Sequence, residues 1–181
     1  MLAGTRPPDA YVPDPHRWRT LAVLSVVLFM SLIDVSIVNV ALPSIQLGLG
    51  ATDSQLQWVL SGYALTFGVG LVTAGRAGDI YGRAPLFVVG VALFTASSAA
   101  AGLAHDATLL NVARALQGVG SGLISPQVVG MVQQYFRGAE RARAFAIFGA
   151  AVGVSVAVGP LLGGLLIAAG GPLHGWRWTF F

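Results

Sequence analysis

Gly75-Arg76-Ala77-Gly78-Asp79-Ile80-Tyr81-Gly82-Arg83 is a short polar stretch between two long apolar segments. It holds three charged residues and three glycines in nine positions. The apolar segments on either side are long enough to cross a bilayer, so the stretch is predicted to be a tight turn at the membrane surface. In such a turn the charges have a fixed depth and a fixed side of the membrane.

The composition as a whole is that of a chain surrounded by lipid. Hydrophobic residues make up 55% of the 181 positions, charged residues make up 9%, and the mean hydropathy is +0.76. A soluble domain has about 25% charged residues, so this chain has too few to cover a surface that faces water. Its ten arginines form no stripe with interleaved aromatic residues, which disfavours a nucleic-acid partner. Cysteine is absent and the three histidines lack the spacing of metal ligands. We therefore expect the protein to bind no metal and no cofactor, and not to be an enzyme.

Apolar runs of about 20 residues recur along the chain, which predicts an all-α, multi-pass membrane protein. We expect residues 1–19 to form a cytoplasmic tail and residues 20–181 to form a bundle of spanning helices, cut off within its sixth span. The five complete spans are expected at Thr20–Leu42, Ser54–Ala74, Pro85–Ala104, Thr108–Gly130 and Ala144–Ala169, and the sixth begins near Trp176.

The arginines predict the orientation of this bundle. Eight of the ten fall in the N-terminal tail, in the stretch Gly75–Arg83 or in residues 133–143, which are alternate connections. Positive residues gather in cytoplasmic loops, so the N-terminus and these connections are expected in the cytoplasm, with the chain in the plasma membrane.

Two charged residues are predicted inside the membrane at similar depth. Asp34 lies roughly 12 Å below the outer end of its helix, and Arg114 roughly 9 Å below the same face. A charge at such depth costs about 2.5–3.5 kcal/mol to insert, which marks a functional residue or a structural pair. If their helices are neighbours, the two can pair, and Gln117 lies one turn from Arg114 and can join them. Arg114 could instead snorkel to the surface, and Asn39 is expected to bond a neighbouring helix.

Several residue patterns together resemble the major facilitator superfamily, and within it the multidrug/proton antiporters of fourteen spans. The first span carries Leu32-Ile33-Asp34-Val35-Ser36-Ile37-Val38-Asn39-Val40-Ala41-Leu42-Pro43, and Gly75–Arg83 is similar to the superfamily's loop between spans two and three. Arg114-Ala115-Leu116-Gln117-Gly118-Val119-Gly120 is similar to its fourth-span motif. Gly159-Pro160-Leu161-Leu162-Gly163-Gly164 resembles the antiporter motif of span five, and Trp176–Phe181 resembles the opening of span six.

The resemblance implies a proton-driven exporter of small, bulky or lipophilic compounds, often cationic, with the proton gradient as its energy source. It implies that Asp34, Arg114 and Gln117 serve coupling or substrate binding. It implies a cytoplasmic gate formed by Gly75, Asp79, Gly82 and Arg83, and an antiport helix shaped by Gly159, Pro160, Gly163 and Gly164. Ile80 and Ala84 depart from the loop motif, where basic residues are usual.

Simpler interpretations stay open beside these roles. Asp79 could cap the third helix. The glycine pairs, including Gly118 with Gly122 and Gly149 with Gly153, could serve close helix packing alone. A superfamily symporter for a sugar or metabolite is the main rival function, and a non-transporting membrane subunit is another. The family's fold has two six-helix halves around the substrate, so we expect this chain to be an N-terminal fragment that needs its missing half to transport.

Overall fold

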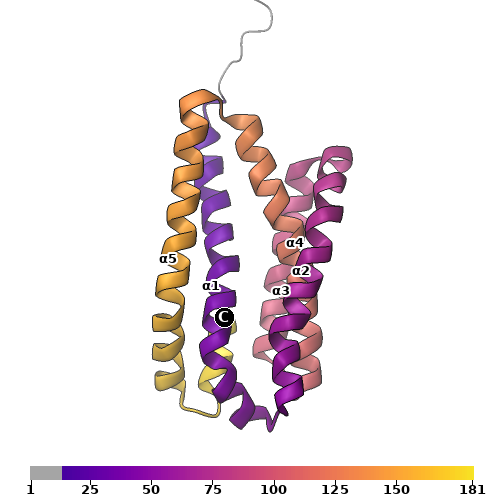
Figure 1. Cartoon of the computed structure of the whole chain (residues 1–181), viewed down its shortest axis with the longest axis vertical. Coiled ribbons are helices and arrows are strands. Elements are labelled where there is room, and N and C mark those ends of the chain that lie inside the picture. Colours follow the sequence, from indigo (N-terminus) through magenta and orange to yellow (C-terminus); the bar gives the residue numbers. More distant parts are fainter. Residues whose placement is uncertain (1–13) are drawn as a thin grey trace, which may run out of the picture.

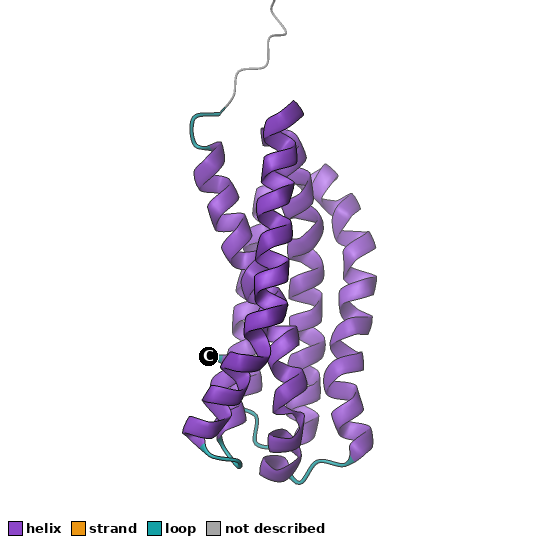
Figure 2. Ribbon diagram, turned by 60° about the vertical axis from the view of Figure 1, so that its left-hand side comes forward, coloured by secondary structure: helices purple, strands orange, loops and turns teal. Residues whose placement is uncertain are grey.

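The computed structural model describes residues 14–181 as a bundle of long, roughly antiparallel helices (Figures 1 and 2). The helices are α1 (Arg17–Leu49), α2 (Asp53–Tyr81), α3 (Arg83–Gly102), α4 (Ala107–Tyr135) and α5 (Gly138–Gly170), followed by the short 3₁₀ helix η1 (Gly175–Phe180). The described part contains no strand. The all-α membrane fold expected from the sequence is therefore correct.

The helices run past most of the predicted spans. The 33 residues of α1 extend about 50 Å, whereas the hydrocarbon layer is about 30 Å thick, so the helix ends reach the interfaces or the helix tilts. Arg17 and Arg19, which were expected in the tail, belong to the first turn of α1. The rest of the predicted tail, including Arg6, lies largely outside the described residues.

The stretch Gly75–Arg83 is not the nine-residue loop that the sequence predicted. Its first seven residues form the last two turns of α2, and α3 begins at Arg83. Gly82 alone joins the two helices, with a φ of 92° that a glycine adopts without strain. The expected cap is also wrong, because Asp79 lies within α2 and α3 has no side-chain hydrogen bond at its N-cap.

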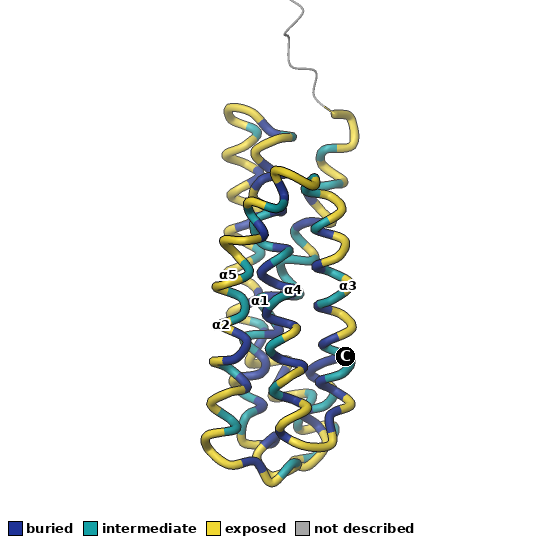
Figure 3. Tube along the Cα trace, turned by 90° about the vertical axis from the view of Figure 1, so that its right-hand side faces the viewer, coloured by how far each residue is buried: buried dark blue, intermediate teal, exposed yellow. Residues whose placement is uncertain are grey.

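Helix α4 is the centre of the bundle. Its buried residues outnumber those of any other described helix, and they include polar ones (Figure 3). By length and composition, α1, α2, α3 and α5 are apolar enough to cross a membrane. Helix α4 is just as long but carries Arg114, Gln117 and Gln127, which its neighbours shield.

Helix α4 approaches α2 and α3 closely at three of its glycines, Gly118, Gly120 and Gly122. A Cβ on Gly118 would collide with the Tyr63 carbonyl oxygen and the Thr66 side chain of α2. A Cβ on Gly120 would lie 2.7 Å from the Phe94 backbone nitrogen of α3. These contacts confirm close packing for this group, since small residues bring helix backbones together in lipid.

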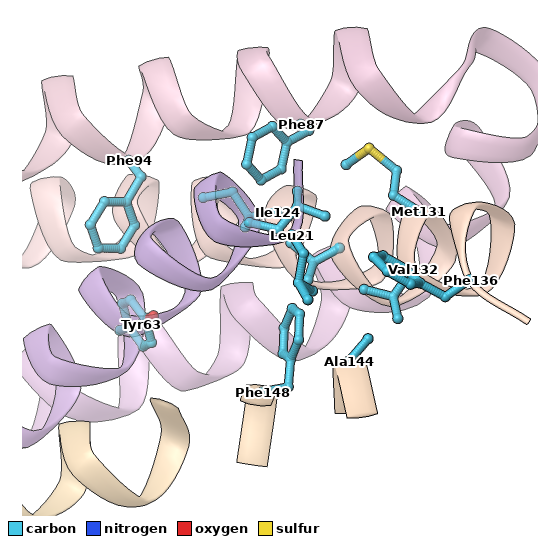
Figure 4. Packing of buried hydrophobic residues seen from close by; sticks show 12 residues of the cluster. Leu21, Tyr63, Phe87, Phe94, Ile124, Met131, Val132, Phe136, Ala144 and Phe148 are labelled. Carbon is cyan, nitrogen blue, oxygen red and sulfur yellow. The ribbon is translucent and has the colours of Figure 1, made fainter. Parts of the chain in front are cut away.

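The helices divide into two groups. Helices α2 and α3 pack along α4, and α1 packs along α5, while α1 touches the first group much less (Figure 1). One apolar cluster spans both groups toward the end where α1 begins (Figure 4). In α5, Gly159 and Gly163 pack against α1, but Gly149, Gly153 and Gly164 have open space where a Cβ would stand. The packing interpretation is therefore wrong for the pair Gly149 and Gly153 within the described chain.

The helix η1 closes the opposite end of the bundle. Trp176 is fully buried, and its indole nitrogen donates to the Leu173 carbonyl oxygen at 3.0 Å. The Arg177 guanidinium donates to the carbonyl oxygen of Gly102, the last residue of α3, at 2.9 Å. The Ser98 hydroxyl of α3 donates to the Phe180 carbonyl oxygen at 2.7 Å. The bonds of Arg177 and Ser98 hold the beginning of the predicted sixth span against α3.

We predict that Gly120→Ala lowers the thermal stability of the chain in lipid nanodiscs, by about 1–3 kcal/mol, because the added Cβ meets backbone atoms that cannot turn away. Gly149→Ala is the matched control. It adds the same methyl group in open space and should leave the melting temperature unchanged or slightly raised. Unfolding followed by tryptophan fluorescence measures both, and equal melting temperatures for the two variants would contradict the packing.

Candidate functional site

The two charges predicted inside the membrane meet at the junction of the two helix groups. Asp34 comes from α1, and Arg114 and Gln117 come from α4. One guanidinium nitrogen of Arg114, Nη1, donates to Asp34 Oδ2 at 2.6 Å and to Gln117 Oε1 at 2.8 Å. Gln117 Nε2 donates to Asp34 Oδ1 at 2.9 Å. Both carboxylate oxygens are thus bonded, and the three side chains close a ring.

The ring is shielded from the surroundings. Arg114 is 0% exposed, Gln117 0% and Asp34 6%. The ion pair gains strength in a low dielectric, but each charge also loses its hydration, so removing one partner leaves the other at high cost. A ring with every member bonded is the arrangement that tolerates such burial.

Helix α2 supports the guanidinium from a further side. Arg114 Nε donates to the Val59 carbonyl oxygen at 3.3 Å. The guanidinium carbon lies 4.3 Å from the centre of the Tyr63 ring, a cation–π contact. Sequence reasoning missed Tyr63. Its position one helical turn after Val59 gives no hint of Arg114, because the contact joins residues about 50 positions apart.

The structure decides two of the open expectations about these charges. Arg114 does not snorkel, since it is fully buried and bonded to Asp34. Asn39 does not bond a neighbouring helix in the described chain. Its Nδ2 donates to the Val35 carbonyl oxygen of its own helix at 2.8 Å, and the residue is exposed. The expectation for Asn39 is therefore wrong, because an asparagine can satisfy its donor on the preceding turn.

Cavities lie on both sides of the ion pair. A cavity of about 580 Å³ opens between α1, α2, α4 and α5, and Arg114 and Tyr63 form part of its wall. A second cavity, of about 360 Å³, lies between α1, α3, α5 and η1 and includes Asp34. The wall of the larger one mixes apolar residues with hydroxyl and amide groups: Leu28, Ser31, Leu32, Val35, Ser36, Asn39, Leu60, Ala64, Phe67, Ser121, Ser125 and Val156.

The residues of the predicted gate lie at the end of the bundle where α1 begins. Arg83 Nη2 donates to Asp79 at 2.6 Å, and Arg83 Nη1 donates to the Pro126 carbonyl oxygen of α4 at 3.3 Å. The guanidinium passes directly over Gly130, where a Cβ would collide with it. Arg83 therefore ties α2, α3 and α4 together at this end, and a gating role for it stays a prediction.

The other glycines of this region are placed by packing. A Cβ on Gly75 would lie 3.8 Å from Pro126, an ordinary van der Waals contact, and Gly82 supplies the positive φ between α2 and α3. Gly78, which the prediction did not include, leaves room for the Gln127 amide, whose nitrogen donates to the Ala74 carbonyl oxygen at 2.7 Å.

The four residues of the predicted antiport helix have different surroundings. Gly159 is buried against Ser36 of α1, and a Cβ on Gly163 would lie 3.4 Å from Ile37. Pro160 lies inside α5 and is exposed, and Gly164 faces open space. Of these four residues, Gly159 and Gly163 pack against α1. The role of this helix in antiport stays a prediction.

We predict that Asp34→Leu destabilises the chain in nanodiscs by about 3–5 kcal/mol, because it leaves the Arg114 guanidinium buried without a counter-charge. The double variant Asp34→Leu/Arg114→Met removes both charges and should recover most of that loss. Thermal unfolding of the single and double variants measures the coupling. A double variant no more stable than Asp34→Leu alone would contradict the pairing.

Comparison with known proteins agrees with this architecture. A family model described as Major Facilitator Superfamily matches residues 24–181. The chain is 39% identical over 192 residues to the "Probable actinorhodin transporter" of Streptomyces coelicolor, covering 98% of this chain and 33% of that protein. It is 39% identical over 165 residues to the "Tetracenomycin C resistance and export protein" of Streptomyces glaucescens, covering 91% of this chain and 30% of that protein. The chain thus spans about a third of the length of these curated relatives.

Solved structures show the same fold. The crystal structure of a bacterial homolog to the human lysosomal transporter Spinster, in an inward-facing and unoccupied conformation, superposes with a TM-score of 0.80 at 21% identity. The match covers 93% of this chain and 40% of that one. On the family match and these relatives, the chain belongs to the Major Facilitator Superfamily.

Proposed function

We propose that this chain is part of a proton-coupled exporter of small, bulky or lipophilic compounds. The relatives named as export, resistance or transport proteins support export. The observation that carries the proposal is the ring of Asp34, Arg114 and Gln117, a titratable carboxylate held inside the bundle beside a cavity. An ionisable side chain at this depth marks a proton or ion pathway.

The ring suggests how a proton would be coupled to substrate. While Asp34 is ionised, its charge balances Arg114 and both of its oxygens are bonded. A proton on Asp34 removes that balance and leaves the guanidinium as an unbalanced positive charge in the wall of the 580 Å³ cavity. The positive charge would lower the affinity for a cationic compound, so that proton uptake and substrate release go together.

The energy source in this proposal is the proton gradient, and no cofactor takes part. The arginine distribution supports a plasma-membrane protein whose N-terminus is cytoplasmic. Arg17 of α1, Arg83 of α3 and Arg141 of α5 belong to helix starts that share one end of the bundle (Figure 1). In this orientation Asp34 lies near the middle of the 33 residues of α1, and the proton gradient would supply its protons from outside.

We further propose that the chain works as the first half of a longer polypeptide. Major facilitator folds hold substrate between two helical halves, near the middle of the bilayer. The described cavity has walls from one half only. The chain alone should therefore show no pH-driven transport of a fluorescent dye in sealed vesicles, and dye accumulation by the 181-residue chain would contradict this part of the proposal.

We predict that Asp34→Asn in the full-length gene product abolishes dye export driven by a pH gradient, because asparagine keeps the shape but cannot carry a proton. Inverted membrane vesicles loaded by an imposed gradient measure the export. Asp53→Asn is the matched control, since Asp53 is an exposed aspartate at the start of α2 that only accepts a bond from Gln46. Export by Asp34→Asn at the wild-type rate would remove Asp34 from the coupling.

A further inference from the structure

The Tyr63 ring lies against the Arg114 guanidinium, and its position in the bundle suggests a role in the proton step. We propose that Tyr63 is a positioning residue that keeps the Arg114 guanidinium fixed to α2 and α4, so that a proton on Asp34 releases α1 and α5 while Arg114 stays in place. The inference rests on the proposed proton coupling and adds which part of the bundle moves. Tyr63 itself transfers no proton in this scheme.

The contacts of Arg114 fall into two unequal sets. Toward its own group it bonds Gln117 of α4 and the Val59 carbonyl oxygen of α2, and it lies over the Tyr63 ring. Toward the other group it bonds Asp34 alone. Two of the four contacts, with the Val59 carbonyl oxygen and the Tyr63 ring, do not involve Asp34, whereas Gln117 also bonds Asp34. We therefore expect the Arg114 guanidinium to stay in place against α2 and α4 when Asp34 is protonated.

Tyr63 is itself held firmly. Its carbonyl oxygen lies against Gly118 of α4, so its backbone cannot move independently of that helix. One turn further, the Thr66 hydroxyl donates to the Ala115 carbonyl oxygen of α4 at 2.7 Å. Its ring stacks nearly parallel on Phe67, with 6.2 Å between ring centres and 5° between planes. Tyr63 is 6% exposed, and Figure 4 shows its ring within the apolar cluster. The aromatic ring of Tyr63 is therefore held in a fixed position against Arg114.

Helix α1 lacks comparable ties to this group. Its packing runs along α5, through Gly159 against Ser36 and Gly163 against Ile37. Away from the helix ends, the described side-chain hydrogen bonds from α1 or α5 to α2, α3 or α4 all end on Asp34. Asp34 is therefore the polar link between the two helix groups within the membrane, and its protonation weakens that link first.

Few charged or titratable groups surround Asp34 in the described chain. Arg114 faces it from α4, and Tyr63 lies beneath Arg114 on α2. The remaining helices around Asp34 contribute neutral side chains: Phe94, Thr95, Ser98 and Ala99 from α3, Leu162 and Leu166 from α5, and Trp178, Thr179, Phe180 and Phe181 from the C-terminal segment. A pH-dependent movement near Asp34 would therefore originate in a change of charge at Asp34 itself.

The experiment measures the separation of the two helix groups as a function of pH. The chain has no cysteine, so Leu65→Cys on α2 and Val154→Cys on α5 introduce two exposed labelling sites without further changes. Spin labels at these sites, on protein in lipid nanodiscs, report the distance by double electron–electron resonance. We expect a pH-dependent change of the distance distribution that Asp34→Asn abolishes, leaving it in the low-pH form throughout.

Two substitutions of Tyr63 then test its role. Tyr63→Leu removes the ring that positions the Arg114 guanidinium against Asp34, so the contact between the two charges is less well held. The midpoint of the pH-dependent distance change should then move to higher pH by about one unit. Tyr63→Phe keeps the ring and should keep the wild-type midpoint. Tyr63→Met, an unbranched apolar replacement, should match Tyr63→Leu and serves if the leucine variant folds poorly.

The outcomes separate this inference from the proposed function. A wild-type midpoint in both Tyr63→Leu and Tyr63→Met would overturn the role of Tyr63 and leave Asp34 as the proton site. A pH-dependent distance change that persists in Asp34→Asn would overturn the proposed proton site, and the inference with it. A purely structural role for Tyr63 would lower the melting temperature of the variants but leave the midpoint in place.

Discussion

A charge in a hydrocarbon layer must find a partner, and this requirement fixes how the two helix groups meet. Asp34 and Arg114 would each cost about 2.5–3.5 kcal/mol alone at such depth. Paired with each other and with Gln117, they satisfy both carboxylate oxygens within the bundle. Away from the helix ends, the described side chains form no other hydrogen bond between α1 and α4. This bonded ring is therefore the polar contact that fixes α1 against α4, beside the apolar packing of the two helices.

The rest of the bundle makes one side of this junction stiff. Glycines in α4 bring α2 and α3 to backbone contact, where a single methyl group would not fit. At the end where α1 begins, Arg83 joins α3 to Asp79 of α2 and to the Pro126 carbonyl oxygen of α4. Helices α1 and α5 pack on each other and meet this unit through apolar contacts and Asp34. A change of charge at Asp34 thus acts at the contact between the two helix groups, which we expect to separate more easily than the closely packed helices α2, α3 and α4.

Much of this arrangement could be predicted from the sequence, because lipid imposes simple rules. Apolar runs indicated the five long helices, and the helical rise placed Asp34 and Arg114 at matching depth, which is where the structure brings them together. The spacing of Gln117 from Arg114 put it on the same face, and it joins the pair. The role of these residues in coupling is a matter for experiment.

The failures share a cause, which is that local patterns do not reveal neighbours. Glycines and charges in Gly75–Arg83 suggested a loop, yet α2 continues through most of it, because packing against Gln127 and Pro126 supports the helix where propensity does not. The same continuation removed Asp79 from the cap of α3. Tyr63 could not be found from the sequence, since its importance comes entirely from Arg114, on another helix.

The central claim is that the Asp34 carboxylate and the Arg114 guanidinium are in direct contact inside the membrane. Solid-state NMR on protein in lipid bilayers, labelled with ¹³C at the aspartate carboxyl carbon and ¹⁵N at the arginine side chain, measures it through the carbon–nitrogen dipolar coupling. Because Asp79 and Arg83 form a second pair, the spectrum of Asp34→Asn is subtracted. The account predicts that the difference retains a strong coupling, consistent with the 2.6 Å separation of Asp34 Oδ2 and Arg114 Nη1. A difference spectrum without such coupling would contradict it.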